Sequence, residues 1–178
     1  TGLTEWANRV GEQEANRIKS EAAGLGSLMH THLENFIMEV PRPSGNNVVR
    51  KMASEMADQI IHHGLVKVQE VWGIEKMLYF PELYAGTSDL IGVHEGRPAI
   101  MDYKTSKKIK KEEYIQDYFL QGAAYALAHN KVYGTDINKI VIFMVSRDLK
   151  FKEFVVEGNL FKNYCNEWIK RLEEFYQS

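Results

Sequence analysis

The stretch "GTSDLIGVHEGRPAIMDYKTS", residues 86–106, has the pattern of two β-strands joined by a short turn. A two-residue turn at Glu95-Gly96, with glycine supplying a positive φ, predicts an antiparallel hairpin. In that register Asp89 faces Asp102 directly, whereas a loop longer by one residue would break the pairing. Directly opposed side chains have Cβ atoms about 4.5–5.5 Å apart, and like charges at that separation destabilise a sheet.

Two facing carboxylates on a partly buried sheet need either a shared proton or a cation between them. Mg²⁺ or Mn²⁺ suits such a site because both ions prefer oxygen ligands. Lys104 lies two residues beyond Asp102, so its side chain leaves the strand on the same face. The simpler alternative is an Asp–Lys surface pair on an edge strand.

The composition narrows the class of protein. The chain has 178 residues, of which 44% are apolar and 26% charged, as in an ordinary globular domain. A formal net charge of -2 argues against coating nucleic acid by bulk charge, so a polyanion would need a local basic patch. The single cysteine, Cys165, excludes an intramolecular disulfide and a cysteine-ligated iron–sulfur cluster. The sequence has no apolar stretch long enough to predict a membrane span. It also has no Walker motif of the kind that predicts a P-loop ATPase.

Hydrophobic periodicity predicts a mixed α/β chain with helices at both ends. We expect one domain over residues 1–178, with a helical part (1–65), a sheet with a crossover helix (66–157) and a C-terminal helix (158–178). Thr4 is a candidate N-cap, and Gly24 and Gly26 are expected to interrupt the first helix. Within these parts the expected helices are 48–63 and 111–130, and the expected strands are 66–80, 84–94, 98–104, 139–145 and 151–157.

Two helical segments carry further polar candidates. His30 and Glu34 share one helix face at i and i+4, and a neutral imidazole is a common metal ligand, although a lone helical histidine is usually an ordinary residue. His32 points elsewhere and is expected to be exposed. Gln121 and Tyr125 also share a face, which is either functional or a buried polar contact between helices. Small residues at 122 and 123 would let that helix pack closely on the sheet.

Taken together, these pieces resemble the RecB-type branch of the PD-(D/E)XK nuclease superfamily. The pattern of that branch is matched in order by Gly26-His30-Glu34, Glu75, Gly86-Asp89, Asp102-Lys104 and Gln121-Tyr125. The segments "GLTEW", "RVGEQEAN", "DYKTSKK" and "EWIKRLEEFY" carry a closer likeness to mitochondrial and podophage exonucleases. Ser88 replaces the usual proline, and Asp102 replaces the usual glutamate. The four cluster-binding cysteines of some relatives are absent, so no iron–sulfur cluster is expected.

The resemblance implies a restriction-endonuclease-like αβββαβ core and a set of roles. Mg²⁺ or Mn²⁺ would be bound by His30, Asp89, Asp102 and the backbone carbonyl of Tyr103. Lys104 would orient the attacking water or stabilise the transition state. The expected supporting residues are Glu75, in the metal shell or beside the water, and Gln121 and Tyr125, which would hold the phosphate or Lys104. Glu34 would be structural.

A protein that binds DNA needs positively charged groups for the phosphates, and one that binds unpaired bases needs aromatic surfaces for stacking. The segment after the hairpin supplies Thr105, Lys107, Lys108, Lys110 and Lys111, which either bind phosphates or form a solvated loop. Five aromatic residues are either base-stacking platforms or core: Trp72, Tyr79, Phe80, Tyr84 and Phe119.

We therefore expect a metal-dependent DNA exonuclease that acts on single strands or free ends in replication, recombination or repair. The alternatives are a DNA-binding module that has the nuclease fold without turnover, and a structure-specific or restriction-type endonuclease. Other replication or recombination proteins are candidate partners, and no membrane partner is expected. The expected location is intracellular, with a bacterial or phage-infected cytoplasm favoured over a mitochondrion.

Overall fold

The computed structural model describes residues 11–178, apart from the side chains of residues 13–15 and 17–22. The predicted cap at Thr4 lies outside the described residues. The chain forms two compact units, of which the first ends at Asp58 and the second is Gln59–Ser178. The expectation of a single domain stays a prediction. No helix within residues 11–178 is long and apolar enough to cross a membrane.

The first unit consists of helix α2 (Glu12–Ile37), a loop, and most of helix α3 (Val48–His63). The expected interruption of the first helix is wrong, because α2 runs without a break through Gly24 and Gly26. A glycine inside a helix costs only about 1 kcal/mol relative to alanine, which a long helix tolerates. The side chain of Asn47 accepts a hydrogen bond from the backbone N–H of Arg50 at 2.8 Å and so caps the start of α3.

Arg42 ties the loop to both helices of this unit. Its guanidinium donates to Nδ1 of His32 at 3.0 Å, to Asp58 at 2.8 Å and to the carbonyl of Ser54 at 3.0 Å. His32 is buried, contrary to the expectation that it is exposed. Burial lowers the pKa of His32, and the positive charge of Arg42 lowers it further, so the ring stays neutral and accepts the hydrogen bond.

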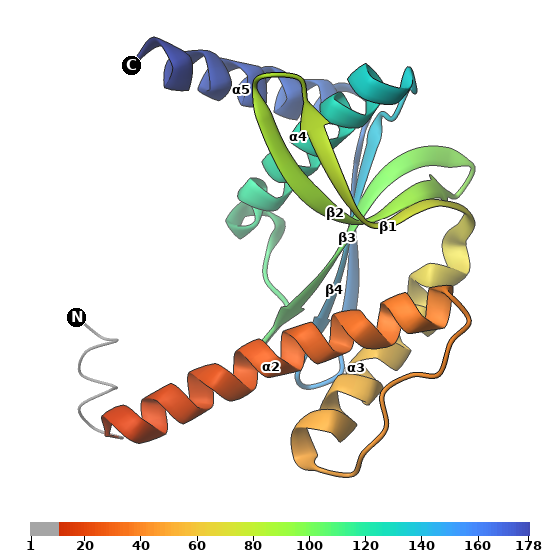
Figure 1. Cartoon of the computed structure of the whole chain (residues 1–178), viewed down its shortest axis with the longest axis vertical. Helices are drawn as coiled ribbons and strands as arrows, with labels where there is room; N and C mark the ends of the chain where they lie inside the picture. Colours follow the sequence, from red (N-terminus) through yellow and green to blue (C-terminus); the bar gives the residue numbers. More distant parts are fainter. Residues whose placement is uncertain (1–10) are drawn as a thin grey trace. The chain divides into compact units, whose positions relative to one another are not determined.

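The second unit is a five-stranded sheet in the order β1-β2-β3-β4-β5, with helices α4 and α5 (Figure 1). All neighbouring strands are antiparallel except β3 and β4, which are parallel. The elements are β1 (Val68–Phe80), β2 (Tyr84–His94), β3 (Arg97–Ser106), α4 (Gln116–Tyr133), β4 (Lys139–Ser146), β5 (Phe151–Glu157) and α5 (Gly158–Gln177). The predicted mixed sheet, the order of elements and the crossover helix are confirmed.

The core of this unit lies between the sheet and the two helices. Every residue of β4 is buried, as its continuous apolar sequence predicts, and α4 connects β3 to β4 as the crossover. Gly122 of α4 lies so close to the sheet that an added Cβ would come within 2.5 Å of the Ile140 side chain. The small residues in this part of α4 therefore bring the helix directly onto the sheet at β4, the strand that pairs with β3.

Two elements begin later than predicted. β1 begins at Val68 because Leu65–Lys67 form a short 3-10 turn, and α4 begins at Gln116 because Glu112–Tyr114 form another. The apolar stripe of α5 is buried only at Phe161 and Cys165, while Phe175 is 69% exposed.

Gly92 allows two backbones to approach closely in the sheet. A Cβ at this position would collide with the carbonyl oxygen of Glu70 in the partner strand, where the β1–β2 register is irregular. We expect Gly92→Ala to lower the free energy of unfolding by at least about 1–3 kcal/mol, the cost of overpacking. Urea denaturation followed by circular dichroism measures the change.

The matched variant is Gly24→Ala, because Gly24 is exposed in α2 and an added Cβ meets no atom within 4 Å. Alanine should stabilise this helix by about 0.5–1 kcal/mol. If Gly92→Ala lowered the free energy of unfolding by no more than Gly24→Ala changes it, the proposed close approach of the two backbones at Gly92 would be contradicted.

Candidate active site

The acidic pair lies where strands β2 and β3 separate. The hairpin turns at Glu95-Gly96, both with positive φ (45° and 82°), and the paired residues run from His94↔Arg97 to Leu90↔Met101. This register is the one predicted from the sequence. Beyond Leu90, β2 stays paired with β1 while β3 stays paired with β4, so the two strand pairs diverge as a fork (Figure 1).

Asp89 and Asp102 occupy the branch point of the fork, and each accepts a hydrogen bond from the opposite strand. The backbone N–H of Asp89 donates to Oδ1 of Asp102 at 3.1 Å, and the backbone N–H of Tyr103 donates to Oδ2 of Asp89 at 2.9 Å. These bonds replace the next rungs of the ladder. They hold the two carboxylates side by side although their charges repel.

Asp102 is 5% exposed, so its charge is poorly solvated. Burial raises the pKa of Asp102 to about 7, and the neighbouring charge of Asp89 raises it as well, while Lys104 acts in the opposite direction. A carboxyl group whose pKa lies near neutral pH is unusual in a structural role and frequent in functional sites.

Lys104 is held beside Asp102 by two contacts. Its Nζ atom lies 3.9 Å from Oδ2 of Asp102 and 4.5 Å from the centre of the Tyr118 ring, an arrangement typical of a cation–π contact. Tyr118 is not among the residues predicted from the sequence. A signal for it exists, because Tyr118, Gln121 and Tyr125 follow one face of α4 at i, i+3 and i+7.

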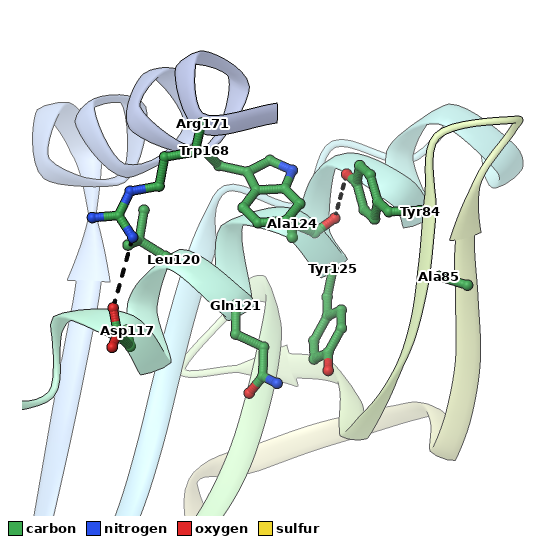
Figure 2. A pocket seen from close by; sticks show the side chains of 9 residues that line it. All are labelled: Tyr84, Ala85, Asp117, Leu120, Gln121, Ala124, Tyr125, Trp168 and Arg171. Carbon is green, nitrogen blue, oxygen red and sulfur yellow. Dashed lines mark hydrogen bonds and ion pairs between the residues drawn. The ribbon is translucent and has the colours of Figure 1, made fainter. Parts of the chain in front are cut away.

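Tyr125 reaches from α4 to the start of β2. A Cβ on Gly86 would lie 2.6 Å from the Tyr125 ring, so the glycine of the predicted motif makes room for this side chain. Burial raises the pKa of Tyr125, and the charges of Asp102 and Asp89 raise it further. Its hydroxyl therefore stays protonated. Gln121 is exposed and projects from the same side of α4 as Tyr125 (Figure 2).

Strands β1 and β2 bend at the acidic pair. Residues five apart in a regular strand point to opposite faces. Gly86 nevertheless contacts Tyr125 of α4, while Ile91 packs into the core with Phe119 of the same helix. The register places Glu75 opposite Asp89, because Ile74 pairs with Leu90 and Lys76 with Ser88. Glu75 has a φ of 44°, which is rare for a side-chain-bearing residue and marks the bend.

The carbonyl of Tyr103 faces the fork. In an extended strand the N–H and C=O of one residue lie on the same edge, as the paired bonds of antiparallel ladders require. The N–H of Tyr103 points to Asp89 of β2, so its carbonyl points to that side rather than to β4. This orientation agrees with the predicted ligand role, which stays a prediction.

The roles of the remaining predicted residues stay predictions. His30 is half-buried in α2 and belongs to the first unit, so its role as a ligand stays a prediction. Beyond β3, the lysines at 107, 108, 110 and 111 are exposed, while Thr105 is half-buried. Among the aromatic candidates, Phe119 is fully buried and belongs to the core, whereas Trp72 and Tyr79 are exposed.

A second cluster of possible metal ligands lies at the turn end of the hairpin. The ligand atoms of His94, Glu95 and Glu153 all lie within 4.8 Å of one another. The ammonium group of Lys67 already lies in this cluster, since its Nζ atom is 2.8 Å from Glu153 and 3.5 Å from Glu95. The side chain of His94 is also bonded to Glu153 at 2.7 Å. Lys67 offsets one of the two carboxylate charges here, as Lys104 does at the fork, but Glu95 is exposed to water whereas Asp102 is buried.

Known proteins resemble this chain in fold and in sequence. No family model matches the sequence. A solved structure from Eubacterium rectale, assigned as an exonuclease, has the same fold, with a TM-score of 0.60 at 13% identity over 86% of this chain and 64% of that one. This likeness shows the fold alone, whereas two relatives in sequence carry the name of a nuclease.

Those relatives are named "Mitochondrial genome maintenance exonuclease 1". The proteins from Xenopus tropicalis and Homo sapiens are each 26% identical over 97% of this chain. The chain spans about half the length of these curated relatives, since the match covers 52% of each.

The raised pKa of Asp102 predicts how stability depends on pH without metal. Between about pH 4 and pH 7 the unfolded chain releases the Asp102 proton while the folded chain retains it, so stability falls as pH rises through this range. Asp102→Asn removes this loss. We expect the variant to raise the Tm by several degrees at pH 8 and to change it little at pH 4.

Thermal denaturation in EDTA, followed by circular dichroism, measures the effect. Asp136→Asn is the control, because Asp136 is an exposed aspartate outside the fork. A Tm difference between Asp102→Asn and wild type that is the same at both pH values would contradict the raised pKa.

Proposed function

We propose that the chain is the catalytic part of a divalent-metal-dependent DNA exonuclease that prefers single strands or free ends. The observation that carries this proposal is the pair Asp89 and Asp102, held together at the fork with Lys104 beside it. The similarity to named exonucleases over 97% of the chain supports the reaction class.

The donor set at the fork fits a hard divalent cation. Two carboxylates and the carbonyl of Tyr103 supply oxygen ligands, which Mg²⁺ and Mn²⁺ prefer. The repulsion between buried Asp102 and half-buried Asp89 also favours a cation, because a bound cation would return Asp102 to its charged form. Glu75, opposite Asp89, and His30 of the first unit are the proposed additional ligands. When bound, the ion would lower the pKa of a water molecule and polarise the scissile phosphate.

The chain's own side chains would orient the phosphate and the water. Lys104 places its ammonium group between Asp102 and the Tyr118 ring, so it presents a positive charge next to the acids. Tyr125 keeps its proton and can donate a hydrogen bond to a phosphate oxygen. Gln121, on the same helix face, can donate through its amide.

DNA would reach the fork along the exposed segment that follows β3. Lys107, Lys108, Lys110 and Lys111 form a local basic patch in a chain whose net charge is -2, and Thr105 lies between this patch and Lys104. This patch supports contact with the phosphate backbone rather than with particular bases. Because the relatives are named for the maintenance of a mitochondrial genome, the proposal includes such a role and a mitochondrial location.

The nuclease reaction is tested on linear and circular single-stranded DNA with Mg²⁺ or Mn²⁺. We expect the wild type to degrade the linear substrate, and Asp102→Asn and Lys104→Ala each to lose at least about 100-fold in rate, as for loss of a group that stabilises the transition state. Gel electrophoresis of the products measures the rates. Asp136→Asn and Lys150→Ala are matched controls on exposed residues.

The same experiment separates the alternatives. Cleavage of circular DNA would indicate an endonuclease. A wild type as inactive as both variants, with DNA affinity unaffected by Asp102→Asn, would indicate a binding module instead.

Metal binding is tested without turnover by thermal shift. Mg²⁺ or Mn²⁺ at 100 times its Kd should stabilise the wild type by about 2.7 kcal/mol, because the folded state binds the ion and the unfolded chain does not. The rise in Tm should disappear in Asp102→Asn and persist in Glu153→Gln, which alters the cluster around Lys67. Loss of the rise in Glu153→Gln alone would place the ion at that other cluster.

A further inference from the structure

A pocket next to the fork is not used by the proposed chemistry. It has a volume of about 320 Å³ and lies between α4, α5 and the start of β2. Figure 2 shows six of its lining residues that matter here: Tyr84, Ala85, Gln121, Tyr125, Trp168 and Arg171. Its volume is at the lower end of the range for small-molecule sites, about 300–1,000 Å³. It can therefore hold one nucleotide but not a run of stacked ones.

The pocket is continuous with the proposed active site through two shared residues. Gln121 and Tyr125 line it, and the Tyr125 ring extends to Gly86 at the edge of the fork. Both acids are close enough for their charges to act on Tyr125. A molecule in the pocket would therefore lie one side chain away from a phosphate bound at Asp89 and Asp102.

The upper wall of the pocket is aromatic and held in place. The rings of Tyr84 and Trp168 meet edge to face, with centroids 5.1 Å apart. The hydroxyl of Tyr84 donates to the carbonyl of Ala124 at 2.8 Å, which fixes the ring against α4. Aromatic side chains that are immobile and partly exposed are good surfaces for nucleobases, whatever the base.

Arg171 supplies a positive charge at the rim. Its guanidinium lies 3.8 Å from Asp117 and 3.2 Å from Glu167, and all three side chains are substantially exposed. Such exposed pairs contribute little and are readily exchanged for another anion. Arg171 also lines a neighbouring hollow of about 280 Å³ between α4 and α5. A cation on the boundary of two hollows is suitably placed for a phosphate that links two nucleosides.

We propose that this pocket binds the nucleotide next to the scissile phosphate, with its base against Trp168 and Tyr84 and its outer phosphate on Arg171. This inference rests on the proposed function, because it takes the phosphate at the fork to be the one that is cleaved. The pocket would hold each nucleotide in turn by stacking and charge, without reading its identity. It would thus position a single strand and exclude a base-paired one, whose bases are already covered on both faces.

Binding is tested first, without catalysis. Thymidine 5′-monophosphate is titrated in EDTA while the indole N–H signals of the chain's three tryptophans are followed by NMR. We expect the Trp168 signal, assigned with Trp168→Phe, to shift and saturate. Arg171→Gln should weaken binding at least about fivefold, whereas Lys170→Gln, the same charge change on the adjacent exposed residue, should not.

Kinetics test the position of the pocket relative to the reaction. Ala85→Leu adds bulk to the lining at an exposed strand position and removes no polar contact. We expect it to raise KM for a single-stranded oligonucleotide about tenfold and to lower kcat much less, because the groups at the fork are unchanged. A melting curve checks that Ala85→Leu folds. If Ala85→Leu does not fold, the same test is made with Arg171→Gln and its control Lys170→Gln, by comparing their effects on KM and on kcat.

The outcomes separate this inference from the proposed function. No shift of Trp168, or the same KM for Arg171→Gln and Lys170→Gln, overturns the nucleotide pocket even if the protein is an active nuclease. A shift that depends on Arg171 in a protein that never cleaves DNA supports the pocket and overturns the nuclease proposal. Equal degradation of single-stranded and duplex ends, insensitive to Ala85→Leu, would also overturn the proposed role of the pocket.

Discussion

The two hydrogen bonds that join the strands at Asp89 and Asp102 are the constraint on which the rest of the site depends. Two like charges at opposed positions of a hairpin would ordinarily push the strands apart. Here each carboxylate accepts a backbone N–H of the other strand, so the strands separate at the acids without losing their connection. The result is a fork in which buried negative charge is placed at the end of a ladder. Burial keeps that charge poorly solvated, and so available to a cation.

The surrounding structure serves to hold this fork open and to bring α4 to it. Close contact of Gly122 with Ile140 sets α4 directly on the sheet, and one face of that helix then delivers Tyr118, Gln121 and Tyr125. Gly86 leaves space for Tyr125 at the start of β2. The absence of a side chain is therefore what matters at these two glycines, since a methyl group at either position would push apart the elements that meet at the acids.

Two groups of acids within the described residues of the second unit have different surroundings. At the turn end of the hairpin, Lys67 pairs with Glu95 and Glu153, His94 is bonded to Glu153, and Glu95 is exposed to water. At the fork, Lys104 lies 3.9 Å from Asp102 and does not prevent burial and Asp89 from raising the pKa of that acid. The acids at the turn end thus have direct partners or access to water, whereas burial leaves the charge of Asp102 poorly solvated. This difference supports the proposal that binding and chemistry occur at the fork.

The sequence by itself determined the hairpin, because the two-residue turn and the alternation of side chains specify the register and hence the meeting of Asp89 and Asp102. It also determined the buried strand β4 and the shared face of Asp102 and Lys104, since these depend on local patterns. Only the tertiary structure revealed the continuous α2, the burial of His32 under Arg42, the bend at Glu75, the contact of Tyr118 with Lys104 and the pocket against Trp168. Each of these depends on residues that are distant in the chain or on a backbone conformation that ordinary propensities disfavour. Local pattern specifies which side chains share a strand or helix face, whereas packing decides which of those faces meet.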